Sequence, residues 1–173
     1  MSTRVPRLLL GTALLSAACS DHSTREARAS ETAGTPVMAT ADNSVCDASL
    51  WQHLYQPKRL KILDACKVVT GVVQDVQPDD DGDMHAVLML DQGQESLVNK
   101  RNTKKKGSGL VIEIVCSLQP KSPKSAIKAC AGYHASVTMP KAGTHARVTG
   151  SYVLDTHNGW EEIHPVSRID VLR

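Results

Sequence analysis

Alternation of apolar and polar residues marks the strands of this chain. In residues 84–91 the apolar side chains of Ala86, Leu88 and Leu90 fall on one face, while His85 falls on the other. Such a period of two is typical of a half-buried strand. Continuous β-branched or apolar runs predict fully buried strands instead. The segments predicted to form strands are 67–76, 84–91, 109–116, 144–155 and, as one or two short strands broken by Pro165, 159–173.

Two segments have helical spacing. Residues 50–66 carry leucines at helical intervals but are interrupted by Pro57, which predicts a short helix and then an extended segment. Residues 121–133 predict a second helix, with Ser122 as its cap and Pro123 as its first residue. A mainly β chain of five to six strands with a helix inserted before the last pair predicts a small OB-like barrel, closed or partly open. An irregular β-sandwich has a similar pattern.

The first nineteen residues have the layout of an export signal. A basic start with Arg4 and Arg7 precedes an apolar run that is too short to span a bilayer. Small residues then lead to Cys19 and resemble a bacterial lipobox, although Ser16 stands where a leucine is usual. We therefore expect a lipoprotein-type signal peptide over 1–19 and lipidation of Cys19, which anchors the chain to a membrane. Ser20 after it favours the outer membrane, facing the periplasm. The alternative is an ordinary signal peptide with an incidental cysteine.

The next segment, 20–44, is rich in Ser, Thr, Ala and charge and has too few apolar residues to order itself, so we expect a flexible tether. Residues 45–173 then form the single folded domain. Removal of Arg4 and Arg7 with the signal takes the basic count from 20 to 18, which equals the 18 acidic residues. A formally neutral chain gives no global electrostatic reason to expect nucleic acid as a partner.

Four cysteines remain after Cys19, an even number that indicates disulfides in an exported chain. Three pairings are open to them, and the spacing favours Cys46 with Cys66 and Cys116 with Cys130. Each bridge would stabilise the fold by about 3 kcal/mol in the chain-entropy model. Without a C-x-x-C pair, a zinc site on these thiols is disfavoured.

A candidate site combines residues from two predicted strands. Asp83 and His85 begin one strand, and Glu162 and His164 lie two residues apart on one face of another, with Trp160 on the same face and Ile163 on the opposite one. If these strands are neighbours, their imidazoles and carboxylates, with Asp155, would suit a divalent metal ion. A bound metal would activate water for hydrolysis. The structural alternative, which we favour, is a hydrogen-bond network that closes the barrel.

The segment 100–106 concentrates positive charge in Lys100, Arg101, Lys104, Lys105 and Lys106. Beside a groove, such a basic segment could grip a phosphate backbone or another anionic ligand. The chain has no Phe and only 5 Trp and Tyr residues, so bases would find few stacking partners. A solvated connection is the favoured interpretation, and a nucleic-acid partner is disfavoured.

Five segments occur in the chain in the order PKRLKILDACKVVTGVV, DDDGDMHAVLMLD, LVNKRN, GLVIEIVC and HARVTGSYVLDTHNGWEEIHPV. Together they resemble a widespread family of small exported or anchored bacterial proteins with an OB-like domain. The family hallmarks are a G-D-x-H segment and an H-G-W-x-E-I-H-P ending, and the similarity covers nearly the whole domain. Here Asn158 separates His157 from Gly159, so His157 is not placed by the motif. The resemblance implies a fold but no activity.

No nucleophile motif, P-loop or dinucleotide fingerprint occurs in the chain. We therefore expect a cell-envelope binding or accessory module that is not an enzyme, has no required cofactor, and engages an unknown envelope ligand or protein. The first alternative is a metal-dependent hydrolase built on Asp83, His85, Glu162 and His164. The second is a binder of an anionic ligand or nucleic acid through residues 100–106.

Overall fold

The computed structural model describes residues 46–173. The expected signal peptide, the lipidation site Cys19 and the tether lie outside the described residues. No helix within 46–173 is long and apolar enough to cross a membrane.

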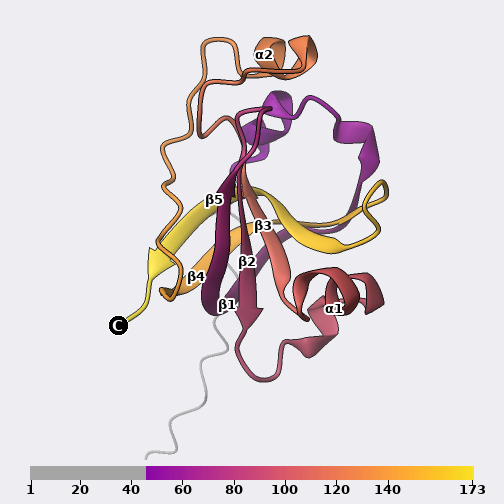
Figure 1. Cartoon of the computed structure of the whole chain (residues 1–173), viewed down its shortest axis with the longest axis vertical. Coiled ribbons are helices and arrows are strands. Elements are labelled where there is room, and N and C mark those ends of the chain that lie inside the picture. The colour runs from indigo at the N-terminus through magenta and orange to yellow at the C-terminus, as the bar shows by residue number, and fades with distance from the viewer. Residues whose placement is uncertain (1–45) are drawn as a thin grey trace, which may run out of the picture. The chain divides into compact units, whose positions relative to one another are not determined.

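The described chain is mainly β, and its five strands form one mixed sheet (Figure 1). Strands pair in the order β1-β2-β3-β5-β4, and β4 pairs back with β1, so the sheet closes into a barrel. β3 and β5 run parallel, and the other pairs run antiparallel. The strands are β1 (Leu60–Pro78), β2 (Met84–Leu90), β3 (Leu110–Ile114), β4 (His145–Asp155) and β5 (Glu161–Val171).

Closure depends on the length of β1, which spans 19 residues. Its first part pairs with β4 up to Val72, and its last part, from Gly71 onward, pairs with β2. Register shifts interrupt both pairings, between Ile62 and Lys67 and again between Gln74 and Gln77. Such irregularities bend and twist a strand, so one long strand serves two neighbours. The end of β1 and the start of β2 both line the cleft described below.

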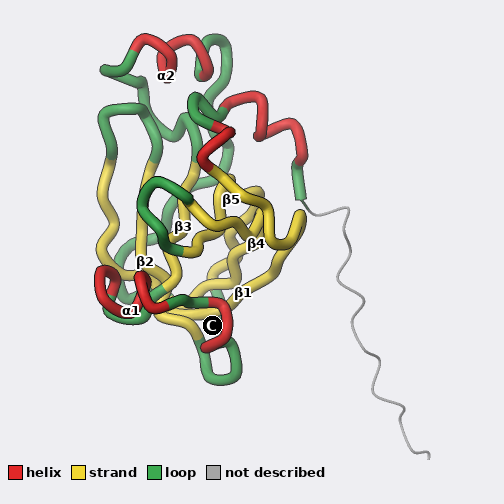
Figure 2. The backbone as a smooth tube through the Cα atoms, turned by 90° about the vertical axis from the view of Figure 1, so that its right-hand side faces the viewer, coloured by secondary structure: helices red, strands yellow, loops and turns green. Residues whose placement is uncertain are grey.

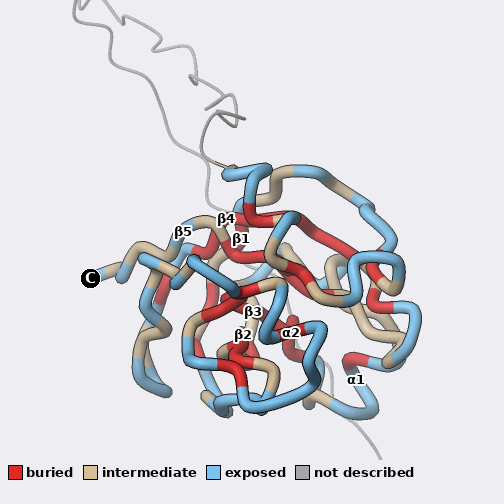
Figure 3. Tube along the Cα trace, turned by 90° about the horizontal axis from the view of Figure 1, so that it is seen from above, coloured by how far each residue is buried: buried red, intermediate tan, exposed pale blue. Residues whose placement is uncertain are grey.

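The barrel interior is filled by aliphatic side chains from all five strands. Ala86 and Leu88 face inward from β2, as the alternation predicts, and Ile163 of β5 is fully buried among them. Every residue of β3 is buried, as the apolar run predicts. Exposed residues concentrate in the loops and along the outer surface of the sheet (Figure 3). This core fixes the strands that carry the polar cluster described below.

Short helices lie at both ends of the barrel (Figure 2). The 3-10 helices η2 (Ala48–His53) and η3 (Pro57–Arg59) precede β1, and α2 (Lys124–Ala129) lies near η2. At the other end are η4 (Glu95–Leu97) and α1 (Lys100–Lys106). Leu50, Leu54 and Cys130 form a second buried cluster beneath η2.

Two disulfides join the cysteines in the expected pairs. Cys46 bonds Cys66 across 20 positions, and Cys116 bonds Cys130 across 14. The second bridge ties the segment after β3 to the end of α2. Cys116 is therefore held rigidly beside the start of β2, where its backbone contributes to the site.

The structure corrects three local expectations. The predicted segment 159–173 forms one continuous strand, β5, over Glu161–Val171, because the β4 pairing shifts register near Pro165 and resumes beyond it. Helix α2 begins at Lys124 with Pro123 as its cap, so Ser122 does not cap it. Residues 100–106 are the helix α1 and not a solvated connection: the Asn99 side chain caps its start, and Gly107, in the left-handed conformation, ends it.

Candidate functional site

The turn between β1 and β2 places Asp83 at the bottom of a cleft. Gly82 adopts a φ of 94°, and an added Cβ would lie 2.7 Å from the carbonyl oxygen of Leu118, so only glycine fits this turn. The Asp83 amide donates to Asp81 Oδ1 at 3.1 Å, and Asp83 Oδ1 accepts from the Cys116 amide at 2.8 Å. One oxygen of the buried Asp83 carboxyl is thereby fixed, and the other, Oδ2, faces β5.

Glu113 of β3 lies at the centre of the polar cluster. His85 and Glu113 are direct partners across the β2–β3 pair, so their side chains lie on the same face of the sheet. His85 Nδ1 lies 3.1 Å from Glu113 Oε1. The Glu113 side chain is only 3% exposed, so its carboxylate needs charged or hydrogen-bonding partners within the protein.

The parallel pairing of β3 with β5 supplies the second histidine. Val111 pairs with Glu162, which places the following His164 beside Glu113. His164 Nδ1 lies 3.0 Å from Glu113 Oε2 and 3.1 Å from Glu162 Oε1. Trp160 Nε1 donates to Glu162 Oε2 at 2.8 Å. Trp160, Glu162 and His164 thus share one side of the chain as predicted, opposite the core residue Ile163.

We call Asp83, His85, Glu113, Glu162 and His164 together the polar cluster. Its histidines and Glu113 support each other's charge. Burial opposes the imidazolium of His164, but Glu113 and Glu162 outweigh it and hold the His164 pKa well above its ordinary value. Burial likewise opposes the carboxylate of Glu113, yet His164 and His85 hold its pKa well below the usual range. The pKa of His85 is also raised, because Glu113 and Asp79 outweigh its burial.

The pKa values of the other two carboxyl groups, those of Asp83 and Glu162, are raised rather than lowered. Burial raises the pKa of Asp83 to about 7, against the opposing attraction of His164. Burial, and then the charge of Glu113, raise the pKa of Glu162. The cluster therefore contains acids with depressed and elevated pKa values within a few ångströms, a pattern concentrated at functional sites.

Three buried side-chain atoms within residues 46–173 have no hydrogen-bond partner, and all three belong to the polar cluster. They are His85 Nε2, Glu113 Oε1 and His164 Nε2. His164 Nε2 lies 3.9 Å from Asp83 Oδ2 and His85 Nε2 lies 3.4 Å from Asp79 Oδ2, whereas Glu113 Oε1 has the His85 imidazole at 3.1 Å. Buried polar atoms are normally paired, so this concentration of unpaired atoms needs an explanation.

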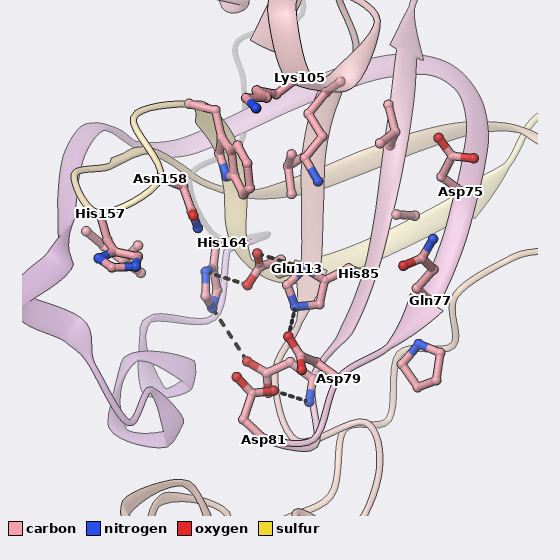
Figure 4. Close-up of a pocket in the computed structure, with 18 of the residues that line it drawn as sticks. Asp75, Gln77, Asp79, Asp81, His85, Lys105, Glu113, His157, Asn158 and His164 are labelled. Carbon is pink, nitrogen blue, oxygen red and sulfur yellow. Dashed lines mark hydrogen bonds and ion pairs between the residues drawn. The ribbon is translucent and has the colours of Figure 1, made fainter. Parts of the chain in front are cut away.

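Four members of the polar cluster, Asp83, His85, Glu113 and His164, line a cleft of about 760 Å³. Figure 4 shows both histidines pointing toward the loop that carries Asp79 and Asp81, with Lys105 on the opposite side of Glu113. His157 and Asn158, from the loop between β4 and β5, form another wall. The cleft therefore has an acidic end and a basic end, with the buried imidazole–carboxylate cluster between them.

Helix α1 is attached firmly to the cleft. Fully buried Asn102 donates to the carbonyl of Glu161 at 2.8 Å, and its side-chain oxygen accepts the Glu161 amide at 2.9 Å. Arg101 Nε donates to the carbonyl of Asn158 at 3.0 Å, and Lys106 Nζ lies 4.3 Å from the ring centroid of Trp160. Lys105 and Lys106 line the cleft, whereas Lys100 and Lys104 are exposed on the helix.

The structure brings together Asp83, His85, Glu162 and His164, the four residues selected from the sequence. Two separate triads place ligand atoms within 4.8 Å of one another: buried Asp83, Glu113 and His164, and the more exposed Asp79, Asp81 and His85. Glu162 belongs to neither triad. A third grouping, with Cys116 and Cys130, is set aside because those sulfurs form a disulfide.

Asp155 lies outside both triads. It is fully buried, binds Arg59 Nη2 at 2.8 Å, and accepts the amide of His157 at 2.8 Å. It stabilises the turn between β4 and β5.

Sequence reasoning missed Glu113, although it is the one charged residue in the apolar run GLVIEIVC. A carboxylate in a buried strand needs a charged or hydrogen-bonding partner. The single Glu in this apolar run was therefore the signal that the sequence offered for a polar site.

No known family model matches the chain, and no curated protein is significantly similar to it. The family resemblance of its motifs therefore stays a prediction, and the function must be argued from the site itself.

Proposed function

We propose that this chain is an envelope-anchored binding module whose OB-like barrel takes a small charged ligand in the cleft. The proposal of an OB-like fold is supported by the closing order β1-β2-β3-β5-β4 and the parallel β3–β5 pair. OB barrels bind ligands across strands 2 and 3, between the β1–β2 and β4–β5 loops. The same two loops border the cleft, through Asp79 and Asp81 on one side and His157 and Asn158 on the other.

The cleft itself is the observation that carries the proposal. Its volume of about 760 Å³ is within the range of small-molecule sites. Lys105 and Lys106 at one end favour an acidic group, and Asp79 and Asp81 at the other favour an amino group. A zwitterionic ligand, of which a short peptide with free termini is the simplest example, satisfies both ends.

Intrinsic fluorescence offers a direct test. The chain has 2 Trp residues, and Trp160 lines the cleft while Trp51 binds Ser151 elsewhere. A Trp51→Phe variant leaves Trp160 as the sole reporter. Titration with di- to tetra-alanine should give a saturable change that disappears when both termini are blocked and weakens in Lys105→Ala. Equal responses to free and blocked peptides, or no response, would contradict the proposal.

The convergence of Asp83, Glu113 and His164 within 4.8 Å favours a second candidate, a metal-dependent hydrolase. A metal with an open position would polarise bound water beside the cleft. The test is hydrolysis of bis(p-nitrophenyl) phosphate and p-nitrophenyl acetate with added Zn²⁺ or Mn²⁺. Metal-dependent turnover that His164→Gln abolishes would support this candidate, and no turnover above buffer with metal would contradict it.

Anchoring to the envelope is a further part of the proposal. Cys19 would carry the lipid, and the two disulfides fit an oxidising compartment such as the periplasm. Nucleic acid is not proposed as a partner, because the lysines of α1 that reach the cleft line a site with the volume of a small-molecule pocket beside Trp160.

A further inference from the structure

The polar cluster combines two independent features of a metal site. Asp83, Glu113 and His164 place ligand atoms within 4.8 Å of one another, and all three side chains are buried. His164 also ends in a buried atom without a hydrogen-bond partner, Nε2. The His164 side chain is 6% exposed, and its Nε2 points toward Asp83 Oδ2.

His164 and Asp83 are each held by a neighbour that leaves a ligand atom free, whereas Glu113 contacts His85 through Oε1 and His164 through Oε2. His164 Nδ1 contacts both Glu162, which is held in turn by Trp160, and Glu113, so Nε2 remains available. Metal-binding histidines commonly bond a carboxylate through the other ring nitrogen. In the same way, the Cys116 amide occupies Asp83 Oδ1 and leaves Oδ2 free. His85 pairs with Glu113 from the opposite side to His164.

We propose that Asp83, Glu113 and His164 bind one divalent transition-metal ion of the zinc class at the floor of the cleft. One imidazole nitrogen with two carboxylate oxygens suits Zn²⁺ or a similar ion, whereas Ca²⁺ and Mg²⁺ prefer oxygen ligands alone. Three protein ligands leave a fourth position open toward the cleft.

The second triad is a weaker candidate and serves as a control. The Asp79 side chain is 54% exposed, and its carboxylate lies 3.4 Å from His85 Nε2. Exposed carboxylates remain hydrated, so replacing Asp79 should leave the buried ion in place. The metal proposal does not depend on the zwitterionic ligand, since binding of the ion is measured without any organic ligand.

The test is Zn²⁺ binding by the untagged chain with both disulfides formed. After removal of metal with EDTA, competition with a chromophoric chelator should give about one tightly bound Zn²⁺ per chain. Asp83→Asn and Glu113→Gln should each weaken binding by about 100-fold or more, because each removes a ligand. Asp79→Asn should change the affinity by less than about 3-fold, since it lies outside the triad.

Two further measurements keep the result interpretable. Circular dichroism must show that each variant is folded, and His164→Gln retains bulk where alanine would leave a hole. Substitution with Co²⁺ should give d–d absorption bands in the wild type that His164→Gln abolishes. Less than about 0.2 equivalents of Zn²⁺ on the wild type would overturn the proposal, as would equal weakening by Asp79→Asn and Asp83→Asn.

Discussion

His164 and Glu113 form a buried pair between two parallel strands, with His164 Nδ1 3.0 Å from Glu113 Oε2. Their strands are distant in sequence, and the pairing of β3 with β5 brings them together. Glu113 also contacts His85 of β2, so one carboxylate connects three neighbouring strands. The same residues therefore help to close the barrel and form the floor of the cleft. Both roles can be measured.

Glu113→Gln should destabilise the metal-free protein by on the order of 3 kcal/mol, because it removes the negative partner of buried His164 and half-buried His85. Urea unfolding in EDTA measures the free energy of unfolding. Glu95→Gln is the matched control, since Glu95 is exposed and remote from the site, and its effect should stay within about 0.5 kcal/mol. Equal effects of the two substitutions would show that Glu113 does not hold the strands together.

The stability of the metal-free protein should be greatest between about pH 4.5 and 6.5, the ordinary pKa values of the two groups. The lowered pKa of Glu113 gives stability that is present above its ordinary value and is lost as the pH falls through its folded value. The raised pKa of His164 gives stability that is present below its ordinary value and is lost as the pH rises through its folded value.

Urea unfolding across this pH range, in EDTA, checks the prediction. The acid-side loss should be smaller in Glu113→Gln, and the alkaline-side loss smaller in His164→Gln. Asp83 contributes with the opposite sign: its pKa is raised to about 7, so it lowers stability as the pH rises from 3.8 toward that value. If both variants show the same pH dependence of stability as the wild type, Glu113 and His164 are not its source.

Asn102→Ala should loosen helix α1 from the cleft. The substitution leaves the amide and carbonyl of Glu161 without their partners, which costs about 1 to 3 kcal/mol. Hydrogen exchange should rise in α1 and at the start of β5 but not in β4. Lys104→Ala, an exposed change on the same helix, should leave both stability and exchange unaltered. Unchanged protection of α1 in Asn102→Ala would argue against this anchor.

The two disulfides should differ in their effect on the site. Replacing either pair with serines should cost about 3 kcal/mol through the entropy of the unfolded chain. Only the Cys116/Cys130 variant should also weaken Zn²⁺ binding, because the Cys116 amide holds Asp83 Oδ1 at 2.8 Å. The Cys46/Cys66 variant is the control. Equal Zn²⁺ affinity in both variants would show that the bridge does not position Asp83.

Cys19→Ser should release the chain from the membrane fraction if Cys19 carries the lipid anchor. Labelling with a fatty-acid analogue, followed by fractionation of expressing cells, measures both lipidation and location. The wild type should be labelled and sediment with the outer membrane, whereas the variant should be unlabelled. A labelled Cys19→Ser variant would contradict the assignment of the anchor.

Local pattern in the sequence predicts the strands better than it predicts their partners. Ala86 and Leu88 face the core as their alternation indicates, and the run around Ile112 is a buried strand. The spacing of the cysteines also favours the observed disulfides. These features depend on neighbouring residues and the period of the strand, which the sequence displays directly.

The features that the sequence did not predict depend mainly on contacts between strands that are distant in the sequence. Glu113 becomes central only because β3 lies between β2 and β5, and no local spacing encodes that order. Helix α1 was missed because its charge suggested a solvated segment, although Asn99 and Gly107 mark its ends. Asp155 lies only a few residues before Glu162 in the sequence, yet its carboxylate pairs with Arg59 and does not join the polar cluster.

Anomalous diffraction from crystals grown with Zn²⁺ tests the central claim, that the polar cluster is a ligand site, most directly. The account predicts one peak at the zinc edge, about 2.0 to 2.2 Å from Asp83 Oδ2, His164 Nε2 and an oxygen of Glu113. The absence of a peak there, with His164 Nε2 hydrogen-bonded to a water molecule, would contradict it. The polar cluster would then not be a metal site.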